Sequence, residues 1–432
     1  MAAALLALTG CGIFRGNGGP RTPVLGERVP ILVAENAIEA DKSIAEVGVL
    51  LPAPSVNEAW AQPGGNAAKS MGHLALGNNL TRAWQASIPG TDRRARLAAA
   101  PVVAEGRLYV IDTRGVVHAF AADTGARVWE AGTSRDDANQ RALFGGGVSV
   151  EGGRAFATNG VGDVVAFDAA TGAEVWRAKP GGPLRGAPTL GNGEVFVLSQ
   201  DNQLFALAQD TGQVGWTQSA TIETQGVFGA AAPALGQGTV IAGFSSGELN
   251  AYRYENGRSL WQDTLSRTSI STSVGSLSDI DAEPVIDGGR VYAVGQGGRM
   301  VALEVVSGQR LWEQNIAGIS TPWIAGEWLF VVTDEAKLVC IARGSGRIRW
   351  ISQLRRYRSE KSRKGPIDWL GPVLAGNRLL LVNSRGEIVS ASPETGAVAG
   401  TVEHGQSISL PPVVAGNTLY VLDDKGRLTA YR

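Results

Sequence analysis

The sequence predicts an all-β protein with the architecture of a closed, eight-bladed β-propeller. Three observations support this prediction. A glycine turn that leads to tryptophan recurs in seven copies, one of which replaces the tryptophan, and a pair of short strands recurs in eight copies. A tryptophan-containing segment ahead of the repeats also supplies a strand that the end of the chain lacks. Each blade of such a propeller is a four-stranded antiparallel sheet.

The first repeated element is a turn around a glycine, with tryptophan four residues later. Copies such as AADTGARVW, which ends at Trp129, and EVVSGQRLW, which ends at Trp312, follow one another at intervals of 38 to 51 residues. This period is that of one four-stranded blade. In the seventh copy, SPETGAVAGT, Thr401 stands at the tryptophan position. Glycine tolerates a positive φ in the turn, and an indole ring is large enough to fill the gap between wedge-shaped blades.

The second repeated element is a pair of short strands, usually led by proline. APVVAEGRLYVID begins at Ala100 and PPVVAGNTLYVLD begins at Pro411, and a copy without the proline, GVSVEGGRAFATN, begins at Gly147. Each copy turns at a loop that contains glycine, which is typical of a β-hairpin. The eight copies therefore predict eight inner hairpins, one for each blade.

The mismatch between seven turns and eight hairpins predicts where the ring closes. The last repeat ends at Arg432, in what would be the third strand of its blade, whereas Trp84 precedes Trp129 by 45 residues, one repeat period. We expect the strand around Trp84 to complete the C-terminal blade. Such closure removes the exposed strand edges that would otherwise invite aggregation.

The first eleven residues are predicted to be a signal segment with a lipobox. The apolar run MAAALLALTG is too short to cross a bilayer core of about 30 Å as a helix and is typical of the apolar region of a secretory signal. Its end, LTGC, resembles the lipobox of bacterial lipoproteins, in which the cysteine, here Cys11, is acylated. Gly12 follows, and this resemblance implies export to the outer membrane. The alternative is an ordinary signal peptide with a chance cysteine.

Residues 12–77 show no repeat and contain several Gly- and Pro-rich stretches. This composition predicts a mostly irregular tether, with one short apolar strand at Val29–Val33. We expect the propeller to occupy residues 78–432.

The composition also argues against several classes of function. The net charge of −1 gives no overall attraction to nucleic acid. The chain has only two cysteines, Cys11 and Cys340, and three scattered histidines, a pattern that predicts no metal site. No nucleophile elbow or Ser-His-Asp order is visible, so we expect no catalytic residues and no cofactor.

The repeats resemble those of the quinoprotein alcohol dehydrogenase propellers. A lipobox ahead of eight such blades resembles the BamB family, the propeller lipoproteins of the outer-membrane β-barrel assembly complex. The resemblance covers residues from about 76 to 432 and the lipobox. It implies a non-catalytic scaffold that is lipid-anchored at the periplasmic face of the outer membrane and binds the barrel insertase BamA. Unfolded outer-membrane proteins are a second class of partner that it allows.

Two loops carry the resemblance to the partner site of that family. LRGAPT begins at Leu184 and SDID ends at Asp281, and similar loops in BamB contact a POTRA domain of BamA. The resemblance therefore implies partner contacts for Leu184, Arg185, Asp279 and Asp281. Where the family has a further leucine, two residues before Leu184, this chain has Gly182.

The repeat map supports the same surface independently. Both loops connect the outer strand of one blade to the inner strand of the next, and all such connections emerge on one face of a propeller. The alternative is that Asp279 and Asp281 only cap turns and that Arg185 is a solvated charge.

Two other functions fit parts of the sequence. A quinone-dependent dehydrogenase would need Ca²⁺ held by oxygen ligands and an adjacent cysteine pair, but the two cysteines are 329 residues apart. An extracytoplasmic sensor or scaffold with a different partner is the other alternative.

A basic run occupies Arg355 to Lys364, with six positive charges and one negative charge. It lies in the connection between the sixth and seventh blades. It would extend the partner surface, meet lipid head groups or remain a solvated loop.

Overall fold

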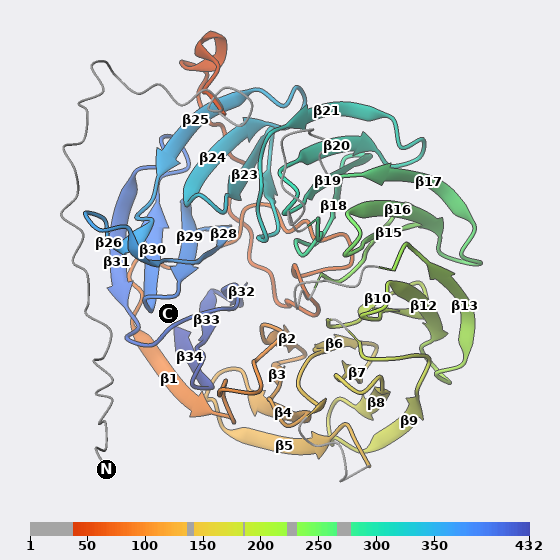
Figure 1. Ribbon diagram of the computed structural model, residues 1–432. Coiled ribbons are helices and arrows are strands. Elements are labelled where there is room, and N and C mark those ends of the chain that lie inside the picture. The colour runs from red at the N-terminus through yellow and green to blue at the C-terminus, as the bar shows by residue number, and fades with distance from the viewer. Residues whose placement is uncertain (1–37, 136–141, 185, 223–230, 266–277) are drawn as a thin grey trace, which may run out of the picture. The chain divides into compact units, whose positions relative to one another are not determined.

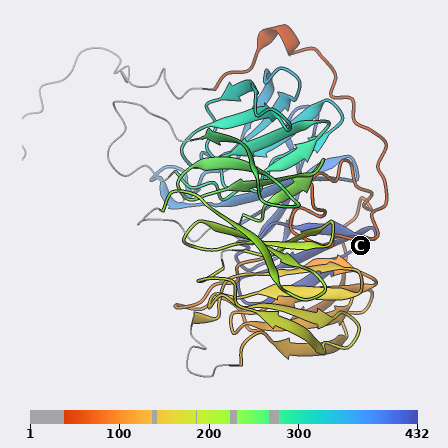
Figure 2. The ribbon, with the colours of Figure 1, turned by 90° about the vertical axis from the view of Figure 1, so that its right-hand side faces the viewer.

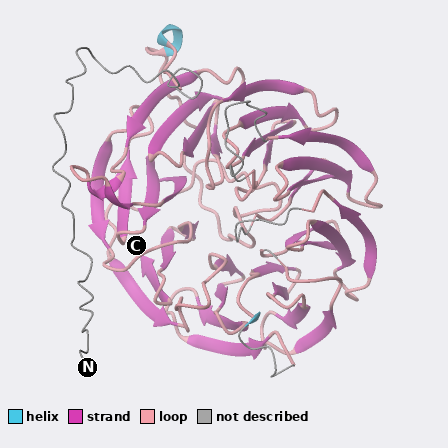
Figure 3. Ribbon diagram, in the orientation of Figure 1, coloured by secondary structure: helices cyan, strands magenta, loops and turns pink. Residues whose placement is uncertain are grey.

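The computed structural model describes residues 38–135, 142–184, 186–222, 231–265 and 278–432. Residues from Ile38 to Arg432 belong to one compact unit. Eight four-stranded sheets stand around a common axis in this unit, as Figure 1 and Figure 3 show. The predicted all-β, eight-bladed propeller is therefore confirmed.

In each blade the strands run in order from the centre of the ring outwards. The first four blades contain the following strands. Blade 1 has β2 (Val102–Ala104), β3 (Arg107–Ile111), β4 (Val116–Ala121) and β5 (Arg127–Gly132); blade 2 has β6 (Val148–Glu151), β7 (Arg154–Thr158), β8 (Val164–Asp168) and β9 (Glu174–Ala178); blade 3 has β10 (Thr189–Gly191), β11 (Glu194–Leu198), β12 (Gln203–Ala208) and β13 (Val214–Ser219); blade 4 has β14 (Ala234–Gly236), β15 (Thr239–Gly243), β16 (Glu248–Arg253) and β17 (Ser259–Thr264).

The remaining blades repeat this arrangement, with a small extra hairpin between blades 6 and 7. Blade 5 has β18 (Val285–Asp287), β19 (Arg290–Val294), β20 (Met300–Glu304) and β21 (Arg310–Gln314); blade 6 has β22 (Trp323–Ala325), β23 (Trp328–Val332), β24 (Lys337–Ala342) and β25 (Ile348–Gln353); the hairpin has β26 (Tyr357–Ser359) and β27 (Lys364–Pro366); blade 7 has β28 (Trp369–Ala375), β29 (Arg378–Asn383), β30 (Glu387–Ala391) and β31 (Val398–Glu403); blade 8 has β32 (Val413–Ala415), β33 (Thr418–Leu422), β34 (Arg427–Tyr431) and β1 (Arg82–Ser87).

The ring closes in blade 8, as the sequence predicts. Strand β1 pairs antiparallel with β34, so that Arg82 lies opposite Tyr431 and Ser87 lies opposite Arg427. The N-terminal strand thus completes the sheet that the C-terminal strands begin. Every blade has four strands as a result.

Burial follows the position of each strand in its blade. Middle strands such as β3 and β11 are buried along almost their whole length, because neighbouring blades cover both of their faces. Outer strands such as β5 alternate, and in β5 the tryptophan is the one buried side chain. The core therefore consists of the contacts between blades.

Seven tryptophans link neighbouring blades at seven of the eight junctions. In each case the indole Nε1 donates to a backbone carbonyl of the following blade, at 2.8 to 3.1 Å. The donor and acceptor residues are Trp84 and Ala122, Trp129 and Ala169, Trp176 and Gln209, Trp216 and Tyr254, Trp261 and Val305, Trp312 and Arg343, and Trp350 and Pro393.

The repeated glycine is required both by its backbone and by this indole. Gly125 has a φ of +71°, and a Cβ atom built on it would lie 2.4 Å from Cε3 of Trp84. The same relation recurs at Gly346, whose Cβ would lie 2.7 Å from Cδ2 and Cγ of Trp312. The indole ring of one blade therefore packs directly on the turn of the next blade.

The junction between blades 7 and 8 is different. Thr401 replaces the tryptophan there, and blade 8 has no turn between its third and fourth strands because β34 and β1 come from the two ends of the repeats. A polar network spans this junction instead. His404 contacts the hydroxyl of Tyr431 at 2.8 Å and Oδ2 of Asp423 at 3.1 Å.

Residues 38–77 lie against the propeller rather than apart from it. Their regular structure is limited to the 3-10 helix η1 (Lys42–Ile44) and isolated bridges, so they are mostly irregular, as expected. They belong to the same compact unit as the blades. The rest of the expected tether, including Val29–Val33, lies outside the described residues.

Part of this segment closes the central channel of the ring. It forms hydrogen bonds with the innermost strand of every blade, which the tether prediction did not anticipate. The bonded pairs are Trp60 with Val103, Ala61 with Val150, Gln62 with Leu190, Ala67 with Leu235, Ala68 with Ile286, Gly72 with Trp323, Leu74 with Leu374, and Asn57 with Val414.

Candidate functional site

The two faces of the ring carry different parts of the chain. One face, which we call the connection face, holds the links from each outer strand to the next blade and the turns between second and third strands. The opposite face holds the other turns, and residues 38–77 pack against it. Figure 1 views the ring from the connection face, and Figure 2 shows residues 38–77, in red and orange, along the other side.

The link between blades 2 and 3 contains Leu184, and its side chain points into the protein. Leu184 is 2% exposed and packs with Phe156, Leu190 and Phe205 in the core between the two blades. Its backbone pairs with Ser199. Leu184 therefore fixes the course of this loop. Arg185, the other residue expected here, lies outside the described residues.

The link between blades 4 and 5 contains the two expected aspartates. Asp279 is buried at 1% exposure, and its carbonyl accepts from the backbone of Gln296 at 2.9 Å. Asp281 is only partly buried and accepts a 2.6 Å hydrogen bond from the side-chain amide of Gln296. The loop is thus held to the turn of blade 5, and Asp281 is the aspartate that reaches solvent.

A relay of hydrogen bonds joins these two loops across blades 3 and 4. Pro183 accepts from the backbone of Gln200, in the turn of blade 3. In the same turn, Asn202 accepts from Ser245 of blade 4, through Ser245 Oγ at 2.8 Å. Ser278 Oγ then donates to the carbonyl of Ser245 at 3.1 Å. The two loops therefore lie on one continuous surface of the connection face.

The polar residues of this relay were not predicted as site residues. Asn202 is fully buried and Ser245 is 6% exposed, so both hold the loops rather than face solvent. In the sequence they appear only as polar residues of a short turn, such as SQDN, which many turns share. Repeat counting locates the turns but does not show that their side chains meet.

The dehydrogenase alternative requires metal ligands and an adjacent pair of cysteine thiols. Among the described residues, no three or more His, Cys, Asp or Glu side chains gather as ligands for a metal ion. Cys340, the one described cysteine, is fully buried in β24. Burial raises the pKa of its thiol, which makes the thiolate form inaccessible at neutral pH. The adjacent cysteine pair of the dehydrogenase alternative has no counterpart here.

The described part of the chain also contains no helix with the length and apolarity needed to cross a bilayer.

The comparisons with known sequences point to one family. The family described as outer membrane protein assembly factor BamB matches residues 113–352 and 356–432. The protein of that name from Yersinia pestis is 24% identical over 329 residues, which cover 75% of this chain and 81% of the relative. The one from Escherichia coli K12 is 26% identical over 345 residues, which cover 79% and 86% respectively.

Solved structures show the same fold. The crystal structure of BamB from Moraxella catarrhalis matches with a TM-score of 0.68 and 18% identity, over 82% of this chain and all of that one. A quinohemoprotein alcohol dehydrogenase from Comamonas testosteroni also gives 0.68, with 14% identity, over 87% of this chain and 80% of that chain. At these identities the structures establish the propeller only, and the assignment rests on the family match. The chain belongs to the family of outer membrane protein assembly factor BamB.

Proposed function

We propose that this protein is a non-catalytic scaffold that helps to assemble outer-membrane proteins and binds a BamA-like barrel insertase. The family match carries this proposal, because the relatives are named outer membrane protein assembly factors. The site would be the part of the connection face where the loops of Leu184 and Asp281 meet.

The geometry of the two loops supports a partner surface. Loops on a rigid scaffold present side chains at fixed positions without deforming the core. Asp281 and Arg185 would contribute the charges that orient a partner, while Leu184 and Asp279 would hold the loops in place. Charged groups of this kind govern specificity and the rate of encounter more than total affinity.

The filled channel also supports a scaffold over an enzyme. The indole rings of Trp60 and Trp323 stack with their centroids 5.9 Å apart, and both are buried. Gln62 and Lys69 of the same segment are buried as well. The part of the channel that these side chains fill is unavailable to a ligand.

We propose that acylated Cys11 anchors the protein to the periplasmic face of the outer membrane. A Cys11→Ala variant should then lose membrane attachment.

Affinity purification from detergent-solubilised envelopes, with identification of the bound proteins, tests the proposed partner. The wild-type protein should recover the barrel insertase. A variant with Arg185→Glu and Asp281→Arg should recover at least about thirtyfold less, since removing one member of a charged pair at an interface costs about 2 kcal/mol or more. Asp279 is left unchanged because it is buried.

Asp210→Arg provides the matched control. Asp210 is exposed in the turn between β12 and β13, on the opposite face of blade 3. This variant should recover as much insertase as the wild type. Undiminished recovery by the double variant would reject the interface, and recovery of a redox partner instead would favour the dehydrogenase alternative.

A further inference from the structure

Basic side chains cover the sector of the connection face that lies over blades 7, 8 and 1. The basic run between blades 6 and 7 forms the hairpin β26–β27, which projects from this face in Figure 2, in blue. All six of its basic side chains are exposed: Arg355, Arg356, Arg358, Lys361, Arg363 and Lys364. The sequence therefore concentrates positive charge where the chain stands out from the ring.

A second basic loop lies further around the same face. The link from blade 8 to blade 1 contains Arg93, Arg94 and Arg96, and all three side chains are exposed. Two turns beside it add Lys425 and Arg114, which are exposed too. We call these five residues and the six of the hairpin the basic arc.

Hydrogen bonds show that the loops between the two basic groups are adjacent on this face. Arg358 of the hairpin donates to the carbonyl of Ser384, in the turn of blade 7, at 2.9 Å. The link from β31 to β32 joins that turn to the turn between β33 and β34 of blade 8. In it, the backbone N–H of Gly405 donates to the carbonyl of Gly386, and the carbonyl of Ser407 accepts from the N–H of Asp424.

The remaining bonds carry the arc to blade 1. The backbone of Ile88 donates to Gly426 at 2.9 Å, and Thr113 Oγ1 donates to the carbonyl of Gly90 at 3.2 Å. The loops from the hairpin to Arg114 are therefore bonded neighbours, and the basic residues lie in two groups, the hairpin at one end and the loop and turns of blades 8 and 1 at the other.

The positive charge of the arc is opposed only at longer range by described acids: Glu335 and Glu360 attract Arg356, and Asp92 attracts Arg94. None of its eleven basic side chains forms an ion pair with a described acidic residue. The acidic side chains of the two loops accept hydrogen bonds from the backbone of their own loop. Glu360 accepts from the backbone of Arg356 and Tyr357, and Asp92 accepts from the backbone of Arg94 and Ala95.

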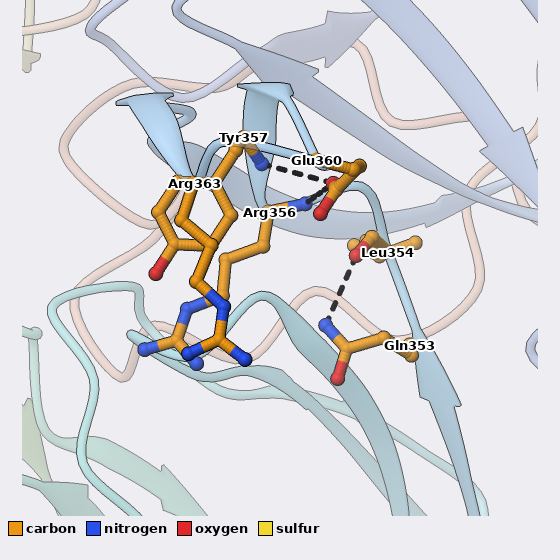
Figure 4. A pocket seen from close by; sticks show the side chains of 6 residues that line it. All are labelled: Gln353, Leu354, Arg356, Tyr357, Glu360 and Arg363. Carbon is orange, nitrogen blue, oxygen red and sulfur yellow. Dashed lines mark hydrogen bonds between the residues drawn. The ribbon is translucent and has the colours of Figure 1, made fainter. Parts of the chain in front are cut away.

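The base of the hairpin combines charge with an aromatic ring. Arg356, Arg363 and Tyr357 line an open hollow of about 330 Å³, shown in Figure 4. The guanidinium of Arg356 lies 5.6 Å from the centre of the Tyr357 ring. In Figure 4 both guanidinium groups point to the same side of that ring, while Glu360 turns back to the hairpin backbone. Amphipathic rings beside basic groups suit a membrane interface.

We infer that the basic arc docks the propeller onto anionic phospholipid head groups. Two observations favour lipid over an acidic protein: the charges extend over three blades, and a membrane anchor is proposed at Cys11. The 27 residues from Cys11 to Ile38 span at most about 90 Å. This inference goes beyond the proposed partner site, which occupies blades 3 to 5, and rests on the proposed anchor only for proximity.

The contributions of the basic residues to lipid binding should be additive and electrostatic. Clusters of basic residues near an anionic surface contribute about fivefold in binding for each charge, and salt screens the attraction over about 10 Å. A triple variant of the hairpin, Lys361→Gln, Arg363→Gln and Lys364→Gln, should therefore bind about a hundredfold more weakly. Arg93→Gln, Arg94→Gln and Arg96→Gln should produce a similar loss.

The test uses the full chain with Cys11→Ser, so that acylation does not contribute, and co-sedimentation with vesicles. Vesicles of phosphatidylglycerol and phosphatidylcholine in equal amounts should bind the protein, and vesicles of phosphatidylcholine alone should not. The control neutralises three arginines of the opposite face, Arg253→Gln, Arg258→Gln and Arg347→Gln, and should bind like the Cys11→Ser parent.

Two results would overturn the inference. One is equal binding to both kinds of vesicle, and the other is unchanged binding of the two arc variants. Because the assay contains no insertase, its failure would leave the proposed partner site standing. Capture of an acidic protein by the arc, without vesicle binding, would assign the arc to a protein instead.

Discussion

At the scale of single residues, the central channel holds an unusual buried charge. Lys69 is 2% exposed, and its amino group donates to Thr189 Oγ1 at 3.2 Å. Burial lowers the pKa of Lys69 to about 8, although attraction to Glu283 opposes this change. Burial likewise raises the pKa of Glu283 against the attraction of Lys69. The pair therefore joins the channel segment to blade 5 at an energetic cost.

Replacement of Lys69 and Glu283 should reveal the energetic cost of burying them. Lys69→Met alone should reduce the free energy of unfolding by about 3–5 kcal/mol, because it leaves a carboxyl group buried without its cation. The double variant Lys69→Met, Glu283→Gln should be as stable as the wild type or up to about 4 kcal/mol more stable. Urea unfolding followed by tryptophan fluorescence measures both. A double variant less stable than the single variant would contradict this account.

The same pair should make stability depend on pH. Between pH 8 and 10.5 the unfolded chain binds a proton at Lys69 more tightly than the folded protein does. The free energy of unfolding should therefore rise with pH in this window, by the linkage of proton binding to folding. The double variant should lack this part of the rise. If the free energy of unfolding depended on pH in the same way in the wild type and in the double variant, a lowered pKa at Lys69 would be ruled out.

The glycine of the repeated turn offers a matched comparison. Gly125 and Gly106 both have a φ of +71°, but only a Cβ on Gly125 would meet an indole ring, while a Cβ on Gly106 would meet nothing within 4 Å. Gly106→Ala should cost about 1–2 kcal/mol of stability for its backbone alone. Gly125→Ala should cost about 1–3 kcal/mol more, because it also overpacks against Trp84. Equal costs would show that the indole contact contributes nothing.

At the scale of elements, residues 38–77 act as a hub for the ring. Trp60 pairs through its backbone with Val103 of blade 1 and stacks on Trp323 of blade 6. Leu74 pairs with blade 7, and Asn57 contacts blade 8. The segment therefore spans the junction of blades 7 and 8, the one junction that lacks an indole link among the described blades. We expect it to strengthen the closure of the ring.

Truncation of the hub side chain tests this expectation. Trp60→Ala should lower the free energy of unfolding by about 3–5 kcal/mol, the usual cost of removing a buried aromatic side chain. Val56→Ala is the control, since Val56 is 58% exposed in the same segment and should change stability little. Limited proteolysis should also cut residues 38–77 sooner in the Trp60 variant. Equal stability of the two variants would mean that the segment is not a hub.

At the scale of the whole molecule, much of the fold follows from the sequence. Repeat counting predicts eight blades and the closing strand around Trp84, because eight inner hairpins but only seven turns are present and Trp84 lies one repeat period before Trp129. It does not predict that residues 38–77 enter the channel, since their contacts are backbone hydrogen bonds and single side chains that form no repeat in the sequence. The sequence also locates both loops of the candidate site on one face. It does not reveal that Leu184 and Asp279 are buried, because burial in a link depends on the neighbouring turns.

The two proposals assign distinct sectors of the connection face: the proposed partner sector over blades 3 to 5 and the basic arc over blades 7, 8 and 1. A scaffold of this kind would hold an insertase on one sector and the membrane on the other. The partner sector is the central claim.

Site-specific photo-crosslinking in living cells tests that claim most directly. A photoreactive residue placed at position 281, and another at position 210 on the opposite face, would each be illuminated and the adducts identified by mass spectrometry. We predict an adduct with the barrel insertase from position 281 and none from position 210. An insertase adduct from position 210 alone, or from neither position, would contradict the account.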